Sequence, residues 1–322
     1  MKNIGIITRV LIIILGYNIT LNAQTISIKP TDSVALSALD GKFNFIIAND
    51  LGRNGYYDQK PVAEMMGEVV ALTGSEFVAA IGDIHHFMGV QSVTDPLWLT
   101  NFEQVYSHPE LMIPWYPVLG NHEYKGNTKA VLNYSSVSRR WQMPATYYTK
   151  QFSVSDSASV LLVFINTVPL IDKYRNHPNQ YPDAANETIE KQLKWIDDVL
   201  KNSQAKWKIV MGHHPLYSGT TKDIVEQTDL QKRLQPILDK YNTDLYVCGH
   251  IHNFQHIKID NSNIDYIVNT SASLTRKVVS HPGMLYSSSD SGFIVCSVED
   301  AQLIVSFVNK LGKIIYQHKR KK

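Results

Sequence analysis

The chain has 322 residues, a formal net charge of +2, 44% hydrophobic residues and two cysteines. This composition predicts a globular chain with a substantial core, and it excludes a disulfide framework or a cysteine-rich metal site. The small charge excludes a strongly basic surface, so no nucleic-acid partner is expected. Cys248 and Cys296 lie in apolar, strand-like runs, which favours buried free thiols over a single disulfide. Any metal site should therefore use some of the twelve histidines together with carboxylates.

Residues 1–23 have the pattern of a cleaved secretory signal. Lys2 and Arg9 are their only charges, residues 10–16 are an apolar core too short to span a bilayer, and Ala23 is a small residue at the expected cleavage point. Cleavage would leave a mature chain of formal charge 0, secreted or periplasmic, with no stable membrane span. The alternative is a retained membrane anchor. Residues 24–40 predict a linker or edge segment, and residues 41–322 a single domain.

Apolar runs alternate with helical patterns in the first part of this domain. Strands are predicted at 43–48, 77–81 and 115–119, and helices at 61–72 and 95–106. Pro61 near the start and Gly74 just after the end of the first helix fit the usual helix asymmetry. This order predicts a βαβαβ unit with a parallel sheet.

The second part of the chain repeats the alternation and then becomes rich in strands. A hairpin is predicted at 147–154 and 160–165, with Asp156-Ser157 near its turn. Helices follow at 185–200 and 230–241, and strands at 207–211 and 245–248. From residue 264 onward the pattern indicates short strands and no helix. The basic residues 318–322 are expected to be a solvated tail.

Five of the predicted strands end in the same way, with Gly or Asn followed by metal-binding residue types. A single His or Asp at such a place is more often a packed residue or a helix cap. Five together, on successive strands, predict one metal site at a sheet edge. His, Asp and Asn suit zinc, iron or manganese better than calcium. The residues are Asp50; Asp83, His85 and His86; Asn121 and His122; His213 and His214; and His250 and His252.

About seven ligands exceed the needs of one ion and fit two ions that share a carboxylate. Two such ions can clamp the attacking and leaving oxygens of a displacement at phosphorus.

The order of these motifs resembles the calcineurin-like metallophosphoesterase superfamily, and within it the purple acid phosphatase, or tartrate-resistant acid phosphatase, branch. The resemblance is carried by Asp50-Leu51-Gly52, Gly82-Asp83, Gly120-Asn121-His122-Glu123, Val210-Met211-Gly212-His213 and Gly249-His250-Ile251-His252-Asn253. It implies an α/β fold in which βαβαβ units form a two-sheet sandwich flanked by helices, with a strand-rich C-terminal part. Residues 41–322 would then be one catalytic domain.

The resemblance also implies a role for each matching position. Asp50 and His252 would bind the first metal, and Asn121, His213 and His250 the second. Asp83 would bridge the two metals. His122 would bind no metal and would donate a proton to the leaving group or stabilise its charge, and Glu123 would orient its neighbours by hydrogen bonds.

One position departs from the branch pattern Gly-Asp-x-x-Tyr, whose Tyr binds ferric iron. The position three after Asp83 is His86, which is predicted to replace the Tyr as a neutral ligand, with His85 as the rival. This exchange favours two divalent or mixed-valence ions of iron, zinc or manganese and argues against a ferric-tyrosinate pair. His214 is a catalytic candidate that would meet substrate phosphate, and the alternative is a structural role. Asn121, Tyr124, Asn253 and Arg53 are weaker candidates for substrate contact.

The expected function is hydrolysis of a small phosphate monoester by a metal-bound hydroxide, with help from His122 and His214. The first alternative is a phosphodiesterase, nucleotidase or pyrophosphatase of the same superfamily. The second is a catalytically inactive binding protein with this fold. A complete set of seven plausible metal ligands argues against the second alternative.

Overall fold

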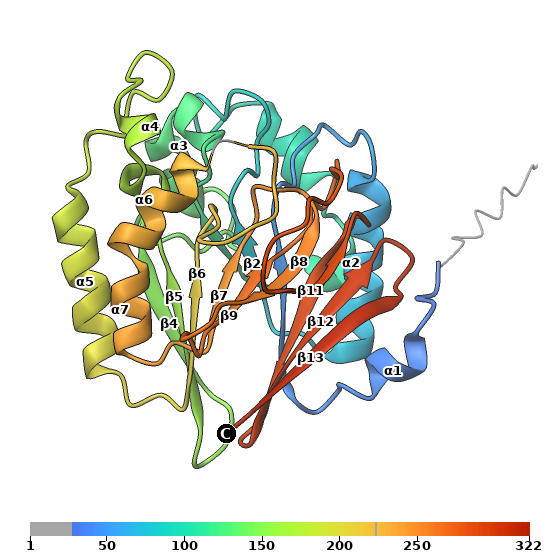
Figure 1. The fold of residues 1–322 in the computed structure, drawn as a ribbon. Coiled ribbons are helices and arrows are strands. Elements are labelled where there is room, and N and C mark those ends of the chain that lie inside the picture. The colour runs from blue at the N-terminus through green and yellow to red at the C-terminus, as the bar shows by residue number, and fades with distance from the viewer. Residues whose placement is uncertain (1–27, 223) are drawn as a thin grey trace, which may run out of the picture.

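The computed structural model describes residues 28–222 and 224–322, which form two β-sheets packed face to face (Figure 1). The first sheet has six strands in the order β13-β12-β11-β1-β2-β3, and the second has seven in the order β10-β8-β9-β7-β6-β5-β4. The strands of the first sheet are β1 (Phe43–Ala48), β2 (Val78–Ile81), β3 (Trp115–Val118), β11 (Gly292–Val298), β12 (Gln302–Asn309) and β13 (Ile314–Lys321). Those of the second are β4 (Tyr148–Ser153), β5 (Ser159–Phe164), β6 (Trp207–Met211), β7 (Leu245–Cys248), β8 (Phe254–Lys258), β9 (Asp265–Val268) and β10 (Met284–Ser288).

Helices lie on the outer faces of the sandwich, as Figure 1 shows. The longest, α2 (Gln59–Thr73), covers the six-stranded sheet, and α5 (Ile189–Asn202), α6 (Val225–Arg233) and α7 (Gln235–Lys240) cover the seven-stranded sheet. The shorter helices are α1 (Ser33–Ser37), α3 (Thr128–Asn133) and α4 (Asp172–Arg175), the 3-10 turns Pro109–Leu111, Glu123–Lys125, Tyr134–Ser136 and Val168–Leu170, and one π-helix, Leu99–Glu103. The predicted α/β sandwich is confirmed.

Each sheet contains a parallel set of strands, and these sets position the polar loops. β1, β2 and β3 pair in parallel, with Ile47 opposite Ala79 and Ala79 opposite Tyr116. β5, β6, β7 and β9 are parallel in the second sheet. The core between the sheets is aromatic, because Phe77 beside the first sheet stacks on Phe152 of the second at 5.0 Å between ring centroids.

Most of the predicted elements are confirmed with shifted ends. The helix predicted at 61–72 is α2, and it ends at Gly74 with a φ of 60°, a left-handed conformation that glycine adopts freely. The hairpin is β4 and β5, and residues 264–322 form strands and loops without a helix. The region predicted as a linker or edge segment contains α1, whose Leu36 is fully buried. The proposed signal, residues 1–23, lies outside the described residues.

Two predicted helices differ from the structure for local reasons. The segment at 95–106 contains only the five-residue π-helix, in which the N–H of Gln104 binds the carbonyl of Leu99 at 3.0 Å, one residue further back than in an α-helix. The helix predicted at 230–241 starts earlier and is divided into α6 and α7. Pro236, the second residue of α7, has no N–H to continue the hydrogen bonds of α6.

The expected solvated tail is wrong: residues 318–321 belong to the edge strand β13. Its alternate side chains face the second sheet, since Arg320 binds Asp244 at 3.1 Å and Asp265 at 2.7 Å. Lys322 also binds Asp244, at 2.7 Å. The basic end of the chain therefore connects the two sheets through two buried aspartates.

Cys248 and Cys296 are buried free thiols, as predicted. Across the described residues, no helix combines the length and the apolar character needed to cross a membrane.

Candidate metal centre

Five loops, each following a strand, bring buried polar side chains to one place between the sheets. Asp50 follows β1, Asp83 follows β2 and Asn121 follows β3, while His213 follows β6 and His250 follows β7. All five side chains are at most 6% exposed. The predicted convergence of the strand ends is therefore present in the fold.

Asp83 lies at the middle of this group. Its Oδ2 is 3.1 Å from His213 Nε2, 3.6 Å from His86 Nε2 and 3.9 Å from His122 Nε2. Its Oδ1 accepts the backbone N–H of His122 at 2.9 Å. One carboxylate oxygen is thus fixed by the backbone, and the other faces three imidazoles.

On one side of Asp83 stand Asp50, His86 and His252. One ligand atom from each of them lies within 4.8 Å of the others. His252 Nε2 is 2.9 Å from Asp50 Oδ1, while Asp50 Oδ2 accepts the backbone N–H of His250 at 2.9 Å and the side chain of Asn49 at 2.6 Å. Asp50 therefore presents a single oxygen to the histidines.

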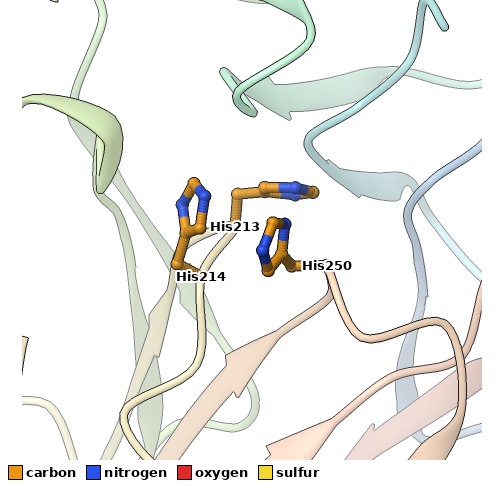
Figure 2. Close-up of side chains that lie close together, drawn as sticks. All are labelled: His213, His214 and His250. Atoms are coloured by element: carbon orange, nitrogen blue, oxygen red, sulfur yellow. The ribbon is translucent and has the colours of Figure 1, made fainter. Parts of the chain in front are cut away.

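The other side holds His213, His214 and His250, which come from the loops after β6 and β7 (Figure 2). Their potential ligand atoms also lie within 4.8 Å of one another. The His250 ring differs from the others because its Nε2 binds the carboxylate of Glu226 at 2.9 Å. This contact leaves the Nδ1 of His250 to face a ligand.

Backbone carbonyl oxygens orient four more rings of the centre. The Nδ1 of His86 binds the carbonyl of Gly52 at 3.1 Å, and that of His213 binds Ile81 at 3.0 Å. The Nδ1 of His122 binds the carbonyl of Phe87 at 2.7 Å, and that of His252 binds Leu274 at 2.5 Å. A carbonyl oxygen only accepts, so each Nδ1 carries its proton. Once its Nε2 is deprotonated, each ring offers the lone pair of that atom to the centre, as metal-binding histidines usually do.

Several donor atoms of the centre have no hydrogen-bond partner outside the centre among the described residues. Two of them meet only other members of the centre, since Asp50 Oδ1 is 2.9 Å from His252 and His213 Nε2 is 3.1 Å from Asp83. Asp50 Oδ1, His86 Nε2, Asn121 Oδ1 and His213 Nε2 are all buried in this state. A buried polar atom without a partner costs roughly 1–3 kcal/mol. Buried donors that have no partner outside the centre fit positive ions, so these residues match a metal centre in type and burial.

The backbone at these loops is strained. Asp50, Asp83, His250 and His252 have φ values of 51°, 53°, 68° and 64°, a left-handed conformation that non-glycine residues adopt at a cost of about 1–2 kcal/mol each. Such outliers concentrate at functional sites. Gly120 is required for a steric reason: a side chain has no space there, because its Cβ would lie 2.3 Å from Asp83 Oδ1.

Charge pairing controls protonation in the centre. Burial alone would raise the pKa of Asp83, but the neighbouring His213 and His122 hold it well below the usual value. Burial likewise opposes ionisation of Asp50, and His252 lowers its pKa well below the usual value. Burial lowers the pKa of His213, but Asp83 reverses this effect and raises it to about 9. Both carboxylates are therefore negatively charged at neutral pH.

His86, and not its neighbour His85, faces the other candidate ligands. The ring of His85 packs edge-on against Trp98, at 4.4 Å between centroids, and Asn101 approaches its Nδ1 at 3.5 Å. Burial without a charged partner in contact lowers the pKa of His85 to about 3. His85 is thus a packed residue behind the centre.

The catalytic role expected for His214 does not fit its position. Its ring is fully buried, its Nδ1 is 2.8 Å from Thr167 Oγ1, and its Nε2 is 2.8 Å from the hydroxyl of Tyr174. Both ring nitrogens are occupied, so the alternative role, structural support, agrees with the geometry.

Two weaker substrate candidates also lie in the wrong place. Tyr124 is 1% exposed, and its hydroxyl accepts Asn166 at 2.6 Å. Asn253 is fully buried, where it donates to the Lys277 carbonyl at 3.0 Å and accepts from Gln255 at 2.7 Å. Both are structural residues, whereas Arg53 lines a cavity together with His86.

The structure adds a supporting residue that sequence reasoning missed. Glu226 on α6 is 3% exposed, and its carboxylate binds His250 Nε2. It also accepts hydrogen bonds from the hydroxyl of Tyr174 at 2.8 Å and from the ammonium of Lys173 at 2.6 Å. No motif in the sequence marks it, because it lies in an ordinary helical pattern 24 residues before His250. Its partners lower the pKa of this carboxyl far below the usual value, against the effect of burial.

Comparison with known proteins agrees with this geometry. Residues 43–254 match the family model described as calcineurin-like phosphoesterase. The chain belongs to this family. It is 34% identical over 298 residues to purple acid phosphatase 3 of Arabidopsis thaliana, covering 88% of this chain and 79% of that protein. It is 31% identical over 273 residues to tartrate-resistant acid phosphatase type 5 of Oryctolagus cuniculus, covering 79% of this chain and 82% of that protein.

Solved structures of the same fold include two informative neighbours. GAP50, the anchor in the inner membrane complex of Plasmodium, aligns with a TM-score of 0.76 and 25% identity, covering 87% of this chain and 89% of that chain. Purple acid phosphatase PPD1 from yellow lupin seeds aligns with a TM-score of 0.64 and 14% identity, covering 88% of this chain and 54% of that chain. This calcineurin-like phosphoesterase, whose relatives are named acid phosphatases, is a metal-dependent phosphoric ester hydrolase. Its family implies a dinuclear metal centre.

Proposed function

We propose that this phosphoesterase hydrolyses small phosphate monoesters at a centre of two metal ions. Asp83 would be shared by both ions. The remaining ligands divide into two sets, Asp50, His86 and His252 for one ion and Asn121, His213 and His250 for the other.

The observation that carries this proposal is a set of buried donor atoms, in the loops that converge at Asp83, that have no hydrogen-bond partner outside the centre among the described residues. They are Asp50 Oδ1, His86 Nε2, Asn121 Oδ1 and His213 Nε2. When bound, two ions of this kind polarise the phosphate and lower the pKa of a water molecule that attacks phosphorus. The neutral His86 in place of a phenolate supports divalent or mixed-valence iron, zinc or manganese.

His122 is the residue placed to assist the leaving group. Its Nδ1–H donates to the Phe87 carbonyl, so only its Nε2 faces the centre. Burial lowers the pKa of His122, opposed by the charge of Asp83. In its protonated form the ring donates from Nε2 to the oxygen that departs from phosphorus, and the fixed Nδ1 contact keeps the ring in this orientation.

A two-part measurement tests the proposal. The metal-loaded protein is assayed with p-nitrophenyl phosphate and with its bis ester, and metal is counted in the same sample. We expect hydrolysis of the monoester, slow or absent hydrolysis of the diester, two ions per chain, and loss of both activity and metal in Asp83→Ala. Faster hydrolysis of the diester would favour the phosphodiesterase alternative.

A binding protein without catalysis is the second candidate, and the likeness to GAP50, named as an anchor in the inner membrane complex of Plasmodium, is the observation in its favour. Protein that folds normally but holds no metal and hydrolyses no ester would support it. We also propose that residues 1–23 direct the chain to a secreted or periplasmic location. N-terminal sequencing of the exported protein tests this, and a mature chain beginning at Gln24 is the expected result.

A further inference from the structure

The turn at His122 is attached to both sheets. His122 precedes the 3-10 turn Glu123–Lys125, and its N–H binds Asp83, which follows β2 of the first sheet, at 2.9 Å. The hydroxyl of Tyr124, in the middle of the turn, instead accepts the side-chain amide of Asn166 at 2.6 Å. Asn166 follows β5 of the second sheet, so Tyr124 connects the turn to the opposite sheet.

Asn166 is itself held in place by several hydrogen bonds. It is fully buried, and its backbone N–H and carbonyl pair with the side-chain amide of Gln192 on α5, at 2.8 and 2.9 Å. Its own amide also donates to Glu187 at 3.1 Å, and the Tyr124 hydroxyl donates to the same carboxylate oxygen at 3.4 Å. Tyr124 is therefore anchored on a group whose position is fixed by a helix and by the segment before it.

The residue after Asn166 supports the other side of the centre. Thr167 Oγ1 is 2.8 Å from His214 Nδ1, and it accepts the backbone N–H of His214 at 3.2 Å. His214 directly follows His213, one of the proposed metal ligands. Two consecutive residues of one loop therefore contact the turn of His122 and the loop of His213.

The ring of His122 depends more on such support than the other rings of the centre do. Its side chain is 17% exposed, whereas the side chains of the proposed histidine ligands are at most 5% exposed and are fixed by packing. His122 is proposed to hold no ion. Its place relative to the departing oxygen is therefore set by the turn and by the contact of its Nδ1 with the Phe87 carbonyl. A displacement of about 1 Å at a reacting centre can lower the rate by about 10²-fold.

We infer that Tyr124 and Asn166 are positioning residues, which act through the turn to place His122 at the oxygen of the leaving group. This inference rests on the role that the proposed function gives to His122. Tyr124 is 1% exposed and Asn166 is fully buried, so both act behind the reacting atoms. Their effect should therefore appear in the assistance to the leaving group and not in the binding of metal.

The test compares two substrates that differ in their need for this assistance. p-Nitrophenol departs readily as an anion, whereas the alcohol of ethyl phosphate needs a proton as it departs. We would measure kcat for p-nitrophenyl phosphate and for ethyl phosphate, and the metal content, with the metal-loaded full chain. Tyr124→Phe removes only the hydroxyl, and Asn166→Ala removes the amide that binds it. Both should raise the ratio of the first kcat to the second about tenfold, with the metal content unchanged.

Tyr134→Phe is the matched control, because it removes another buried hydroxyl, which binds Glu103 of the π-helix at 2.9 Å. It should leave the ratio at its wild-type value. A general loss of stability would lower both kcat values together, so the ratio separates positioning from structural support.

A double variant shows whether the effect passes through His122. His122→Ala alone should raise the ratio further than either positioning variant, and adding Tyr124→Phe to it should change the ratio no more. A ratio that either positioning variant leaves unchanged, or a further change in the double variant, would overturn this inference alone. A ratio that His122→Ala also leaves unchanged would overturn the role proposed for His122, and this inference with it. Absence of ester hydrolysis by the wild type would instead overturn the proposed function as a whole.

Discussion

The carboxylate of Glu123 holds Asp83 through the backbone, since its Oε2 accepts the Asp83 N–H at 2.9 Å. The same oxygen accepts the N–H of Gly120 at 2.7 Å, and Oε1 accepts those of Ile84 and His85 at 2.8 and 3.0 Å. One fully buried side chain thus joins the loop after β2 to the loop after β3. The role expected for Glu123, orienting its neighbours by hydrogen bonds, is confirmed.

Glu123→Gln should therefore lower stability and weaken metal binding together. The amide NH₂ cannot accept from two backbone N–H groups, and two unsatisfied donors cost about 2–6 kcal/mol in total. Urea denaturation and metal analysis measure the two effects. Glu190→Gln, an exposed exchange of the same type on α5, should change neither. Full stability in Glu123→Gln would show that these four hydrogen bonds contribute little.

Glu226 controls one half of the centre through His250. Glu226→Gln removes the charge that binds His250 Nε2 and places a neutral amide beside Lys173 and Tyr174. We expect the metal at the His213 and His250 side to bind about 10–100-fold more weakly, while the metal at the Asp50 and His252 side remains. Titration with zinc should show one tight and one weakened site. Glu64→Gln, on the exposed face of α2, is the control, and two unaltered sites in Glu226→Gln would contradict the assignment.

His122→Ala separates catalysis from metal binding. The ring lies beside the centre and faces Asp83 at 3.9 Å, but it is proposed to hold no ion. kcat should fall by about 10²–10⁴-fold with the metal content unchanged. His177→Ala, at an exposed position after α4, should behave as the wild type in the same assay. Collapse of the metal content in His122→Ala would mean that His122 is a ligand.

The centre itself was predictable because its residues follow directly after predicted strands, which is a local pattern in the sequence. A buried strand ends at Gly82, Gly120, Gly212 or Gly249, and the polar residues follow at once. Parallel pairing of β1 with β2 and of β2 with β3 then brings distant loops to one edge. The sequence indicated His213 as a ligand and left His214 open between a catalytic and a structural role. The structure favours the structural role, because Thr167 and Tyr174 occupy both nitrogens of His214.

Other features depend on long-range contacts that no local pattern reports. Glu226 meets His250 only because α6 packs above the loop after β7. The basic residues of β13 resemble a solvated tail until Asp244 and Asp265 are seen opposite them.

His86→Tyr tests the replacement of the family's tyrosine. The ring of His86 lines the open cavity beside the centre, so a larger side chain has space there. With iron added, the variant should gain a visible charge-transfer band that the iron-loaded wild type lacks, because a phenolate oxygen favours Fe(III). His85→Tyr, behind the centre, should give no such band. A purple wild-type protein would contradict the assignment of His86 as a neutral ligand.

The contact between β13 and β9 predicts how stability depends on pH. Asp265 is 3% exposed and binds His256 at 3.0 Å, Arg320 at 2.7 Å, His318 at 3.4 Å and Lys258 at 3.5 Å. Burial opposes its ionisation, but these partners hold its pKa below the usual value of Asp. A carboxyl whose pKa is lower in the folded state stabilises the fold above its unfolded pKa of about 3.9, and this contribution is lost as the pH falls through the folded value. Burial also lowers the pKa of His256, so protonation of the unfolded chain below about pH 6.5 erodes stability in the same direction.

Asp265→Asn should then cost about 3 kcal/mol of unfolding free energy at pH 7, because it leaves the cations beside it unpaired. The difference from the wild type should shrink as the pH falls below about 4, where the unfolded carboxyl takes up its proton. Urea denaturation of both proteins between pH 7 and pH 3 measures this difference, and subtracting the two curves removes the titration of the metal centre, which they share. Asp260→Asn, at an exposed position after β8, should follow the wild type throughout. A constant difference across this range would show that the charge of Asp265 is not what connects the sheets.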